Sequence, residues 1–261
     1  MSRTGSRTAF VCTAHIASEP LWSSVQPRYL RKHLPGAVLV AAVERESDDL
    51  DYDRLELLEG EHRNKLDQLA RLTLDEMSTD ERDILVFLDG DAFPVRALAS
   101  PIEEMLRATP LAAICRAEND EDYPHPSFCV TTVGFWRRIG GTWETSDDPS
   151  APVNELGGGR LRDLLAEHGI EWRRLLRSNR FDPHPVLFGV YGGLVYHHGA
   201  GFRRPVTEAD RLRCGQAPGN PSSPRDDRLL EEIACRNEAM SSTFKRLIKR
   251  FADFHEVLEE P

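Results

Sequence analysis

The residues best suited to chemistry are two aspartates, Asp89 and Asp91, at the end of the apolar stretch "DILVFLDGDAFPV" (residues 83–95). Side chains two positions apart on a strand project to the same side, so the two carboxylates can converge on one point. Neighbouring carboxylates repel each other unless a cation lies between them, and hard oxygen ligands suit Mg²⁺ or Mn²⁺. Phosphate oxygens usually complete the shell of such ions, so the pair predicts a metal site for a diphosphate substrate. An ordinary acidic turn is the alternative interpretation.

Two short motifs resemble those of GT-A glycosyltransferases. The aspartate stretch is similar to their Asp-x-Asp segment, in which an apolar strand carries the aspartates to a divalent metal that bridges the diphosphate of a nucleotide sugar. The stretch "HGAGFRRP", which begins at His198, is similar to the H-x-x-G-x-x-[KR]-P pattern of the glycogenin and galactosyltransferase-like group. The resemblance covers roughly residues 8–205. It implies a GT-A fold, Mn²⁺ or Mg²⁺ as cofactor, and a nucleotide-diphosphate sugar, first of all a UDP-sugar, as the sugar donor.

The resemblance also implies roles for residues of the two motifs. Asp91 corresponds to the aspartate that ligates the metal directly, and Asp89 to the one that contacts the ribose or a metal-bound water. His198 corresponds to the third protein ligand and is the favoured choice. His197 competes with it, because adjacent side chains on an extended segment point opposite ways. Arg204 corresponds to the basic residue that holds the leaving diphosphate.

The remaining pocket residues are implied by their places in such a fold. The loop after the first strand, the end of the second strand and the polar side of the next helix are expected to contact the nucleotide. For that helix, a solvated face is an equally good interpretation. Besides the aspartates, the candidate nucleotide-binding residues are Thr13, Ala14, His15, Glu44, Arg45, Asn64, Lys65 and Gly90. The sugar and acceptor pocket is expected to border His125, Ser127 and Gly157.

The implied reaction is substitution at the anomeric carbon of the sugar, with a nucleoside diphosphate as the leaving group. An inverting enzyme also needs a carboxylate as general base on the acceptor hydroxyl, and the candidates are Glu155, Asp147 and Asp148. Glu155 serves equally well as an acidic residue at the start of a helix. A retaining enzyme needs no such base, so the stereochemistry stays open. Because Val206 stands where these families generally carry a tryptophan, the subfamily, sugar donor and acceptor stay open as well.

Alternating strands and helices must position these residues. Helical spacing predicts a helix before the aspartate strand, and Ser100, Pro101 and Glu103 form a start signal for another helix after it. A glycine-rich turn at 155–161 is expected to open a helix that stops at Gly169. Short apolar runs predict strands at 9–14, 37–43, 83–89, 111–115, 127–136 and 186–198. The pattern predicts an α/β fold with a mostly parallel central sheet flanked by helices, whose ligands gather beyond the carboxyl ends of the strands.

The chain length predicts one large domain rather than several. A catalytic domain is expected over residues 1–213, followed by a Pro/Gly/Ser-rich loop or linker over 214–227. Residues 228–261 are expected to form a C-terminal helical segment whose apolar stripe packs on the domain.

Composition narrows the class of partner. Acidic residues outnumber basic ones by 43 to 33, and the net charge of −10 argues against nucleic acid or an anionic membrane as the main partner. The apolar runs are too short to cross a bilayer, and "MSRTGSRT" lacks the apolar part of a signal peptide, so a soluble, cytoplasmic protein is expected. The 5 cysteines form no C-x-x-C pair, which indicates neither a disulfide framework nor a zinc site.

Other classes of protein share some of these features. Phosphatases of the haloacid dehalogenase type also use an Asp-x-Asp after an apolar strand. Their motif normally lies near the N-terminus and continues to a Thr or Val, where this chain has Phe93. Nucleotidyltransferases of similar architecture usually carry an N-terminal glycine-rich, basic loop that this sequence lacks. A non-catalytic nucleotide-sugar-binding protein on the same scaffold is the remaining alternative.

Overall fold

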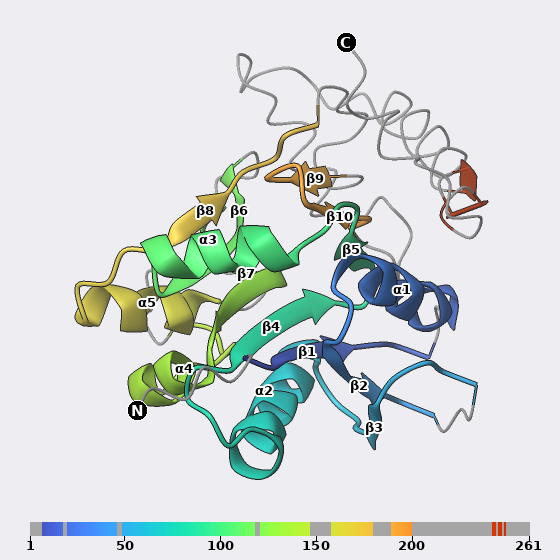
Figure 1. Ribbon diagram of the computed structural model, residues 1–261, viewed down its shortest axis with the longest axis horizontal. Helices are drawn as coiled ribbons and strands as arrows, with labels where there is room; N and C mark the ends of the chain where they lie inside the picture. The colour runs from blue at the N-terminus through green and yellow to red at the C-terminus, as the bar shows by residue number, and fades with distance from the viewer. Residues whose placement is uncertain are drawn as a thin grey trace, which may run out of the picture.

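The computed structural model describes residues 7–17, 20–45, 49–117, 121–146, 158–179, 189–199, 242–243, 245–246 and 248 (Figure 1). The strands are β1 (Ala9–Ala14), β2 (Val38–Val43), β3 (Arg54–Leu57), β4 (Ile84–Asp89), β5 (Ala92–Pro94), β6 (Leu111–Arg116), β7 (Glu121–Thr132), β8 (Arg173–Leu175), β9 (Gly189–Tyr191) and β10 (Val195–His197). The helices are α1 (Pro20–His33), α2 (His62–Leu72), α3 (Ala99–Ala108), α4 (Val133–Ile139) and α5 (Gly159–Glu167), and a π-helical turn, η1 (Thr73–Met77), extends α2.

A seven-stranded sheet with the order β3-β2-β1-β4-β7-β6-β8 forms the centre of the molecule. Strands β3, β2, β1 and β4 run parallel to one another, whereas β7 runs antiparallel to both of its neighbours. The predicted α/β fold with a mostly parallel sheet is therefore confirmed. Because parallel strands end at the same edge, the carboxyl ends of β1, β2 and β4 lie together, and Asp89 is the last residue of β4.

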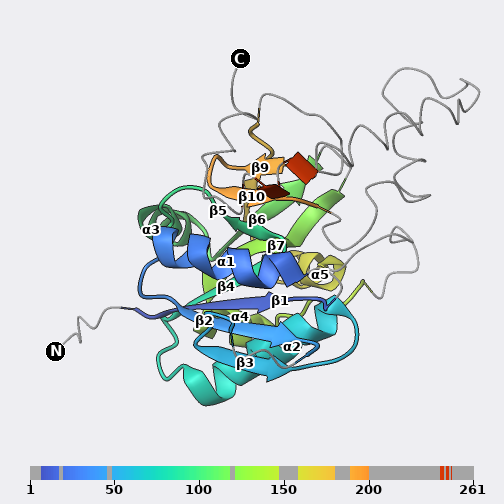
Figure 2. The same ribbon diagram turned by 90° about the vertical axis from the view of Figure 1, so that its right-hand side faces the viewer.

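Hydrophobic cores cover both faces of this sheet. Helices α1 and α3 pack on the face of Val11, and α2, α4 and α5 pack on the face of Phe87. Figure 2 shows α1 and α2 on opposite sides of β1, β2 and β3. Since side chains alternate along a strand, His15 at the end of β1 is directed towards the α1 side and Asp89 towards the α2 side. The edge that carries the aspartates is thus covered from both layers.

A second, three-stranded sheet with the order β5-β10-β9 lies beyond the aspartates. A single strand was predicted over residues 186–198, but the structure has two strands there, β9 and β10. Residues 186–188 of that range lie outside the described part of the chain. Gly192 and Gly193 have φ angles of 58° and 64°, a left-handed conformation that glycine adopts without strain, and they turn the chain between β9 and β10. The hairpin places His197 directly opposite Ala92 of β5.

Two other predicted boundaries were wrong. The strand predicted at 127–136 ends at Thr132, whose hydroxyl accepts a hydrogen bond from the backbone N–H of Phe135 and caps α4. The predicted start signal of α3 does not cap the helix, because α3 begins at Ala99 with Leu98 at its N-cap. Pro101 nevertheless lies in the first turn, where its missing N–H forfeits no helical hydrogen bond. Glu103 pairs instead with Arg7.

Most of the predicted C-terminal organisation, including the linker at 214–227, lies outside the described residues. Ile248 is described and is buried against Trp22 and Val25 of α1. The hydroxyl of Tyr29 donates a hydrogen bond to the carbonyl oxygen of Ile248 at 3.1 Å. At least this position of the C-terminal segment therefore contacts the domain.

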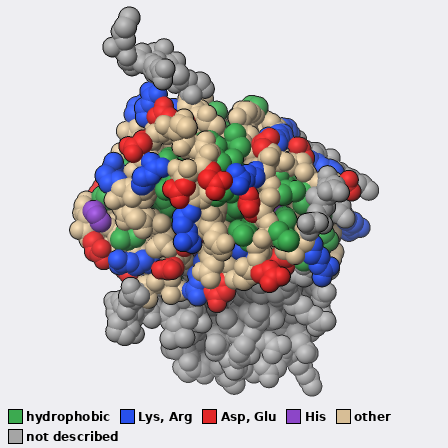
Figure 3. Space-filling view, turned by 90° about the horizontal axis from the view of Figure 1, so that it is seen from below, with side chains coloured by type: hydrophobic (Ala, Val, Ile, Leu, Met, Phe, Trp, Pro, Cys, Tyr) green, Lys and Arg blue, Asp and Glu red, His purple; other side chains and the backbone are tan. Residues whose placement is uncertain are grey.

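Side chains of both charges are interspersed on the face drawn in Figure 3, which is the view of Figure 1 seen from below. The described part of that face gathers no extended basic patch, in keeping with the net charge of −10. Within the described ranges, no helix is long and apolar enough to cross a membrane.

Phe87 tests the core that supports the aspartate strand. Its ring centroid lies 4.6 Å from that of Trp136 and 5.1 Å from that of Trp143, and its side chain is fully buried. We expect Phe87→Ala to lower the free energy of unfolding by about 3–5 kcal/mol, because the cavity cannot refill. Leu57→Ala is the control, since Leu57 is 56% exposed, and it should change stability by less than about 0.5 kcal/mol. Equal urea midpoints for the two variants would contradict the packing described.

Candidate metal centre

The turn that carries the aspartates is held by a neutral side chain from α1. The amide nitrogen of Gln26 donates hydrogen bonds to the carbonyl oxygens of Asp89, at 2.7 Å, and Ala92, at 2.6 Å. Gln26 is fully buried, so water does not compete for these bonds. The two sides of the turn are consequently fixed to each other and to α1. Sequence analysis did not single out Gln26, because nothing in the helix pattern shows which carbonyl groups a buried amide will meet.

Gly90 is required by the close approach of β1 to this turn. A Cβ atom at this position would lie 2.7 Å from the carbonyl oxygen of Ala14 and 2.7 Å from Nδ1 of His15. Both distances are well inside van der Waals contact, and the first involves backbone that cannot move without β1. The glycine therefore allows the ends of β1 and β4 to meet around one site.

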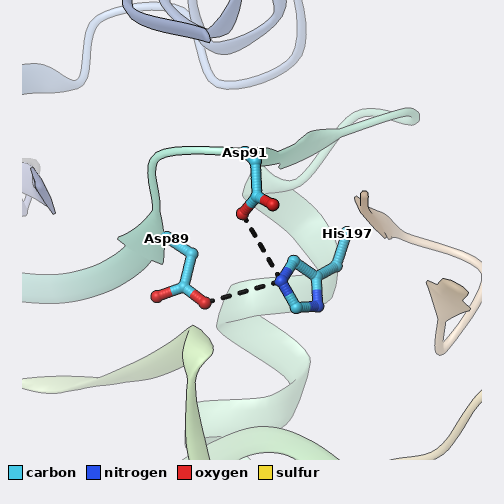
Figure 4. Close-up of side chains that lie close together, drawn as sticks. All are labelled: Asp89, Asp91 and His197. Atoms are coloured by element: carbon cyan, nitrogen blue, oxygen red, sulfur yellow. Dashed lines mark ion pairs between the residues drawn. The ribbon is translucent and has the colours of Figure 1, made fainter. Parts of the chain in front are cut away.

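The aspartates converge with a histidine, as Figure 4 shows. Ligand atoms of Asp89, Asp91 and His197 all lie within 4.8 Å of one another. Nε2 of His197 is 3.5 Å from Oδ2 of Asp89 and 3.4 Å from Oδ1 of Asp91. The exposed fraction of the side chain is 15% for Asp89, 11% for Asp91 and 7% for His197. Two carboxylates and an imidazole are a suitable ligand set for a divalent cation.

The structure brings His197, rather than the favoured His198, to the two aspartates. Pairing between β10 and β5 directs His197 towards the aspartates, and the next side chain points the opposite way. Nδ1 of His198 lies 2.9 Å from the hydroxyl of Tyr196, and its ring packs 4.8 Å from that of Trp22. Burial lowers the pKa of His198 to about 3, so the ring is neutral. The backbone N–H of His198 donates a hydrogen bond to the carbonyl oxygen of Asp91 at 3.1 Å, which helps to hold the aspartate turn.

Three buried polar atoms at the ends of β1 and β4 have no hydrogen-bond partner among the described residues. They are Oγ1 of Thr13, Nδ1 of His15 and Oδ1 of Asp89. Nε2 of His62 approaches Oδ1 of Asp89 to 3.3 Å, but without hydrogen-bond geometry. Buried polar atoms are usually satisfied in folded proteins, so unsatisfied ones at the ends of these two strands indicate a place for a polar ligand there. The residues at this edge fit a bound cation with a phosphate-bearing ligand.

His15 is held as a neutral hydrogen-bond acceptor. Nε2 of His15 lies 2.6 Å from the hydroxyl of Tyr52, and that hydroxyl donates to Oε1 of Gln26 at 3.1 Å. The hydroxyl has one proton and gives it to Gln26, so Nε2 must carry the proton of the imidazole. Burial, with a smaller effect of the neighbouring His62, lowers the pKa of His15 to about 3. Nδ1 is therefore a lone pair that faces Gly90 and the site.

The polar side of α2 differs from the expectation. Lys65 is not on a solvated face but buried, at 1% exposure, with its Nζ atom 2.6 Å from Oε1 of Glu44. The other oxygen of Glu44 accepts the backbone N–H of Ala17 at 2.9 Å, so this pair fixes the loop after β1. Asn64 and Arg45 are exposed, and the positive charge of Arg45 makes a smaller contribution to lowering the pKa of Glu44.

His62, which sequence analysis did not assign to the site, is the α2 residue that reaches Asp89. It is the first residue of α2 and its side chain is 38% exposed. Its place at the start of a helix, beside the carboxyl ends of the strands, is the signal that could have identified it.

His125 and Ser127 lie behind Asp89. The hydroxyl of Ser127 donates a hydrogen bond to Oδ2 of Asp89 at 2.9 Å and lies 2.5 Å from Nδ1 of His125. Both residues are buried. The other predicted site residues, namely Asp147, Asp148, Glu155, Gly157 and Arg204, lie outside the described part of the chain.

The resemblance to GT-A enzymes is confirmed in two features, the mostly parallel α/β sheet and the Asp–Asp–His group at the end of its aspartate strand. No protein-family model matches the sequence. No curated protein matches it significantly either.

Among solved structures, the chain is similar to the apo-form glycosyltransferase GlyE of Streptococcus pneumoniae, with 12% identity, a TM-score of 0.45, and coverage of 65% of this chain and 45% of that one. It thus spans under half of GlyE. The mannosyltransferase PcManGT of Pyrobaculum calidifontis, in complex with GDP-Man and Mn²⁺, matches with 14% identity and a TM-score of 0.38, over 66% of this chain and 55% of that one. A putative glucose-1-phosphate thymidylyltransferase of Bacillus anthracis matches with 10% identity and a TM-score of 0.42, over 83% and 98%. Neither the reaction nor the sugar donor follows from likeness at this level.

The ion pair between Glu44 and Lys65 can be tested through the pH dependence of the free energy of unfolding. The N–H of Ala17 and then the Lys65 ammonium hold the pKa of Glu44 below its ordinary value of 4.5. Its stabilising contribution is therefore present above that value and is lost as the pH falls through the lower folded-state pKa. We expect Glu44→Gln to lower the free energy of unfolding by about 1–3 kcal/mol at pH 7. The difference in the free energy of unfolding between this variant and wild type should become smaller below pH 4.5. Glu59→Gln, at an exposed position, is the control, and a difference independent of pH would contradict the pairing.

Gly90→Ala tests the close approach of β1 to the aspartate turn. We expect a loss of about 1–3 kcal/mol in the free energy of unfolding, because the new methyl group overlaps backbone. Mn²⁺ binding should weaken as well, since the aspartates must shift, and a titration with Mn²⁺ measures this. Gly36→Ala is the control, because nothing lies within 4 Å of that position although its φ is +81°. It should reduce stability through strain alone, and an equal loss of Mn²⁺ binding in both variants would disprove the explanation.

Proposed function

We propose that the protein is a metal-dependent glycosyltransferase, which transfers a sugar from a nucleotide-diphosphate sugar to an acceptor hydroxyl. Its main support is the convergence of Asp89, Asp91 and His197 at the carboxyl end of a parallel strand, where nucleotide ligands bind in such sheets. An isolated acidic turn would have no reason to meet an imidazole from a separate sheet. The motifs that resemble GT-A enzymes point to the same reaction.

The ligand set favours Mn²⁺ over Mg²⁺, because an imidazole nitrogen is a less typical ligand for Mg²⁺. Asp91 and His197 would hold the ion, with Asp89 as a direct or water-mediated ligand. When bound, a divalent ion supplies positive charge that stabilises the leaving diphosphate. The chain itself holds the two carboxylates at a fixed separation through Gln26, so they need not reorganise when charge develops.

The nucleoside would lie against the ends of β1 and β2. Thr13 offers a buried hydroxyl without a partner, and Nδ1 of His15 offers a lone pair that can accept from a ribose hydroxyl or a base N–H. Glu44 and Lys65 would shape this pocket by fixing the loop after β1, rather than by contacting the nucleotide. A UDP-sugar is the first choice of sugar donor, and Arg204 is proposed to hold its diphosphate, on the resemblance alone.

The experiment is a thermal-shift panel with UDP, GDP, ADP, CDP and dTDP, each with Mn²⁺ and with EDTA. A ligand at about 100 times its dissociation constant stabilises the folded state by roughly 2.7 kcal/mol. We expect one nucleotide to raise the melting temperature, and only with Mn²⁺. Asp91→Asn should abolish that shift without changing the melting temperature in EDTA. Asp75→Asn, at an exposed position on η1, should keep it.

Product analysis separates this activity from its rivals. Slow, Mn²⁺-dependent release of the nucleoside diphosphate from its sugar conjugate supports a glycosyltransferase. Release of pyrophosphate from a nucleoside triphosphate and a sugar 1-phosphate would instead indicate a nucleotidyltransferase, and release of phosphate from p-nitrophenyl phosphate a phosphatase. Metal-dependent binding of the nucleotide sugar without any turnover would indicate a non-catalytic binding protein.

A further inference from the structure

A line of buried polar side chains leads away from Asp89 through β7 and β6. Ser127, His125, Arg116 and Glu121 are 0%, 4%, 4% and 7% exposed. Nη1 of Arg116 lies 3.2 Å from Nε2 of His125, and Nε of Arg116 lies 3.4 Å from Oε2 of Glu121. Burying so many polar groups is unfavourable unless they satisfy one another, so their arrangement requires an explanation.

The direction of each hydrogen bond follows from the guanidinium group. Arginine keeps its protons, so Arg116 must donate to Nε2 of His125. A neutral His125 then carries its proton on Nδ1, which donates to the hydroxyl oxygen of Ser127 at 2.5 Å. The backbone N–H of Ser127, 3.2 Å from Nδ1, would instead need a lone pair there, but the single hydroxyl proton of Ser127 goes to the Asp89 carboxylate, so Nδ1 must supply the proton of the 2.5 Å contact. The Ser127 hydroxyl is therefore left to donate its proton to Oδ2 of Asp89.

The strand geometry makes this line possible. His125 and Ser127 lie where the pairing of β7 with β6 is irregular, and there Nδ1 of His125 comes to 2.5 Å from the hydroxyl oxygen of Ser127. Irregular pairing between β6 and β7, with register shifts on both sides of Ile114, brings Arg116 opposite Glu121. The guanidinium thus reaches His125 from the neighbouring strand.

We propose that Ser127 and His125 are positioning residues that fix the orientation of the Asp89 carboxylate. Ser127 holds Oδ2, and Arg116 acts through His125 to keep the Ser127 hydroxyl pointing at that atom. Oδ2 is also the oxygen that faces Nε2 of His197, at 3.5 Å, so this bond fixes the oxygen that lies towards the candidate metal position, whereas Oδ1 lies 3.3 Å from Nε2 of His62. This inference rests on the proposed function, because it assigns the two residues to the metal site rather than to the sugar pocket expected from the sequence.

Loss of the Ser127 hydroxyl should leave the Asp89 carboxylate free to rotate. Partners that orient a metal ligand typically contribute about 10–100-fold to metal affinity. We expect Ser127→Ala to weaken Mn²⁺ binding by a factor in that range, as measured by titration of the full chain with Mn²⁺ alone and detection of free Mn²⁺ by electron paramagnetic resonance. Thr131→Val is the matched control, since it removes another buried hydroxyl of β7, one that donates a hydrogen bond to the carbonyl oxygen of Pro110 rather than to Asp89.

The contribution of His125 is tested by a pair of variants. His125→Asn keeps an N–H donor near the place of Nδ1 and should bind Mn²⁺ within about threefold of wild type, whereas His125→Leu should match the loss in Ser127→Ala. Because His125 acts through Ser127, adding His125→Leu to Ser127→Ala should cause no further loss. If the double variant instead loses Mn²⁺ affinity by the product of the two single losses, the two substitutions act independently. That result would overturn the proposal that His125 acts through Ser127. Should His125→Leu fail to fold, the comparison of Ser127→Ala with Thr131→Val decides.

The outcomes separate this inference from the proposed function. One possible outcome is that wild type binds Mn²⁺, that Asp91→Asn does not, and that Ser127→Ala binds it like wild type. This outcome would support the metal site and overturn the positioning role of Ser127. If wild type binds no Mn²⁺, the proposed function and this inference fail together. Melting temperatures in EDTA identify any variant whose loss of binding reflects loss of folding.

Discussion

Two carboxylates separated by a single glycine repel each other, and the site depends on how the turn that carries them is held. Gln26 ties the carbonyl oxygens on the two sides of the turn to one buried amide, and the backbone N–H of His198 ties the carbonyl oxygen of Asp91. Gly90 lets β1 close against the turn. The groups that make these contacts are uncharged, so they hold the turn without forming an ion pair with either aspartate.

The histidines around the turn have different roles because they differ in burial and in the direction of their side chains. His15 and His198 are deeply buried, and their low pKa values keep them neutral. One of them offers a lone pair to the site, and the other packs between Tyr196 and Trp22. His197 lies between the two carboxylates, and His62 approaches Asp89 from α2 at the exposed rim. A single residue type therefore supplies an acceptor, a packing group and an imidazole that faces both carboxylates at one edge of the sheet.

Buried charge supports the site from both layers. The pair of Lys65 and Glu44 stabilises the loop after β1, and Arg116 with Glu121 anchors the polar line behind Asp89. Such pairs are weak contributors to stability, because desolvation offsets much of their attraction. Their value is that they fix positions, which is what a site that binds a charged ligand requires before the ligand arrives.

The sequence by itself determined the fold class and the location of the chemistry. Alternating apolar and helical periods predict a parallel sheet, and an Asp-x-Asp at the end of a buried run predicts ligand carboxylates at its edge, because both signals are local. The resemblance of its second motif also narrowed the histidine expected beside the aspartates to the adjacent pair of His197 and His198. It could not choose between them, since the choice depends on the register in which β10 pairs with β5.

Only the tertiary structure decided the partners of these residues. Lys65 was expected on a polar face, but the end of β2 provides Glu44 as a buried partner and draws it inwards. The roles of Gln26, Tyr52 and His62, and the line from Arg116 to Ser127, join residues far apart in the sequence, so no local pattern marks them. Local spacing fixes which elements form and where their ends lie, whereas the register between strands and the packing of helices fix which side chains meet.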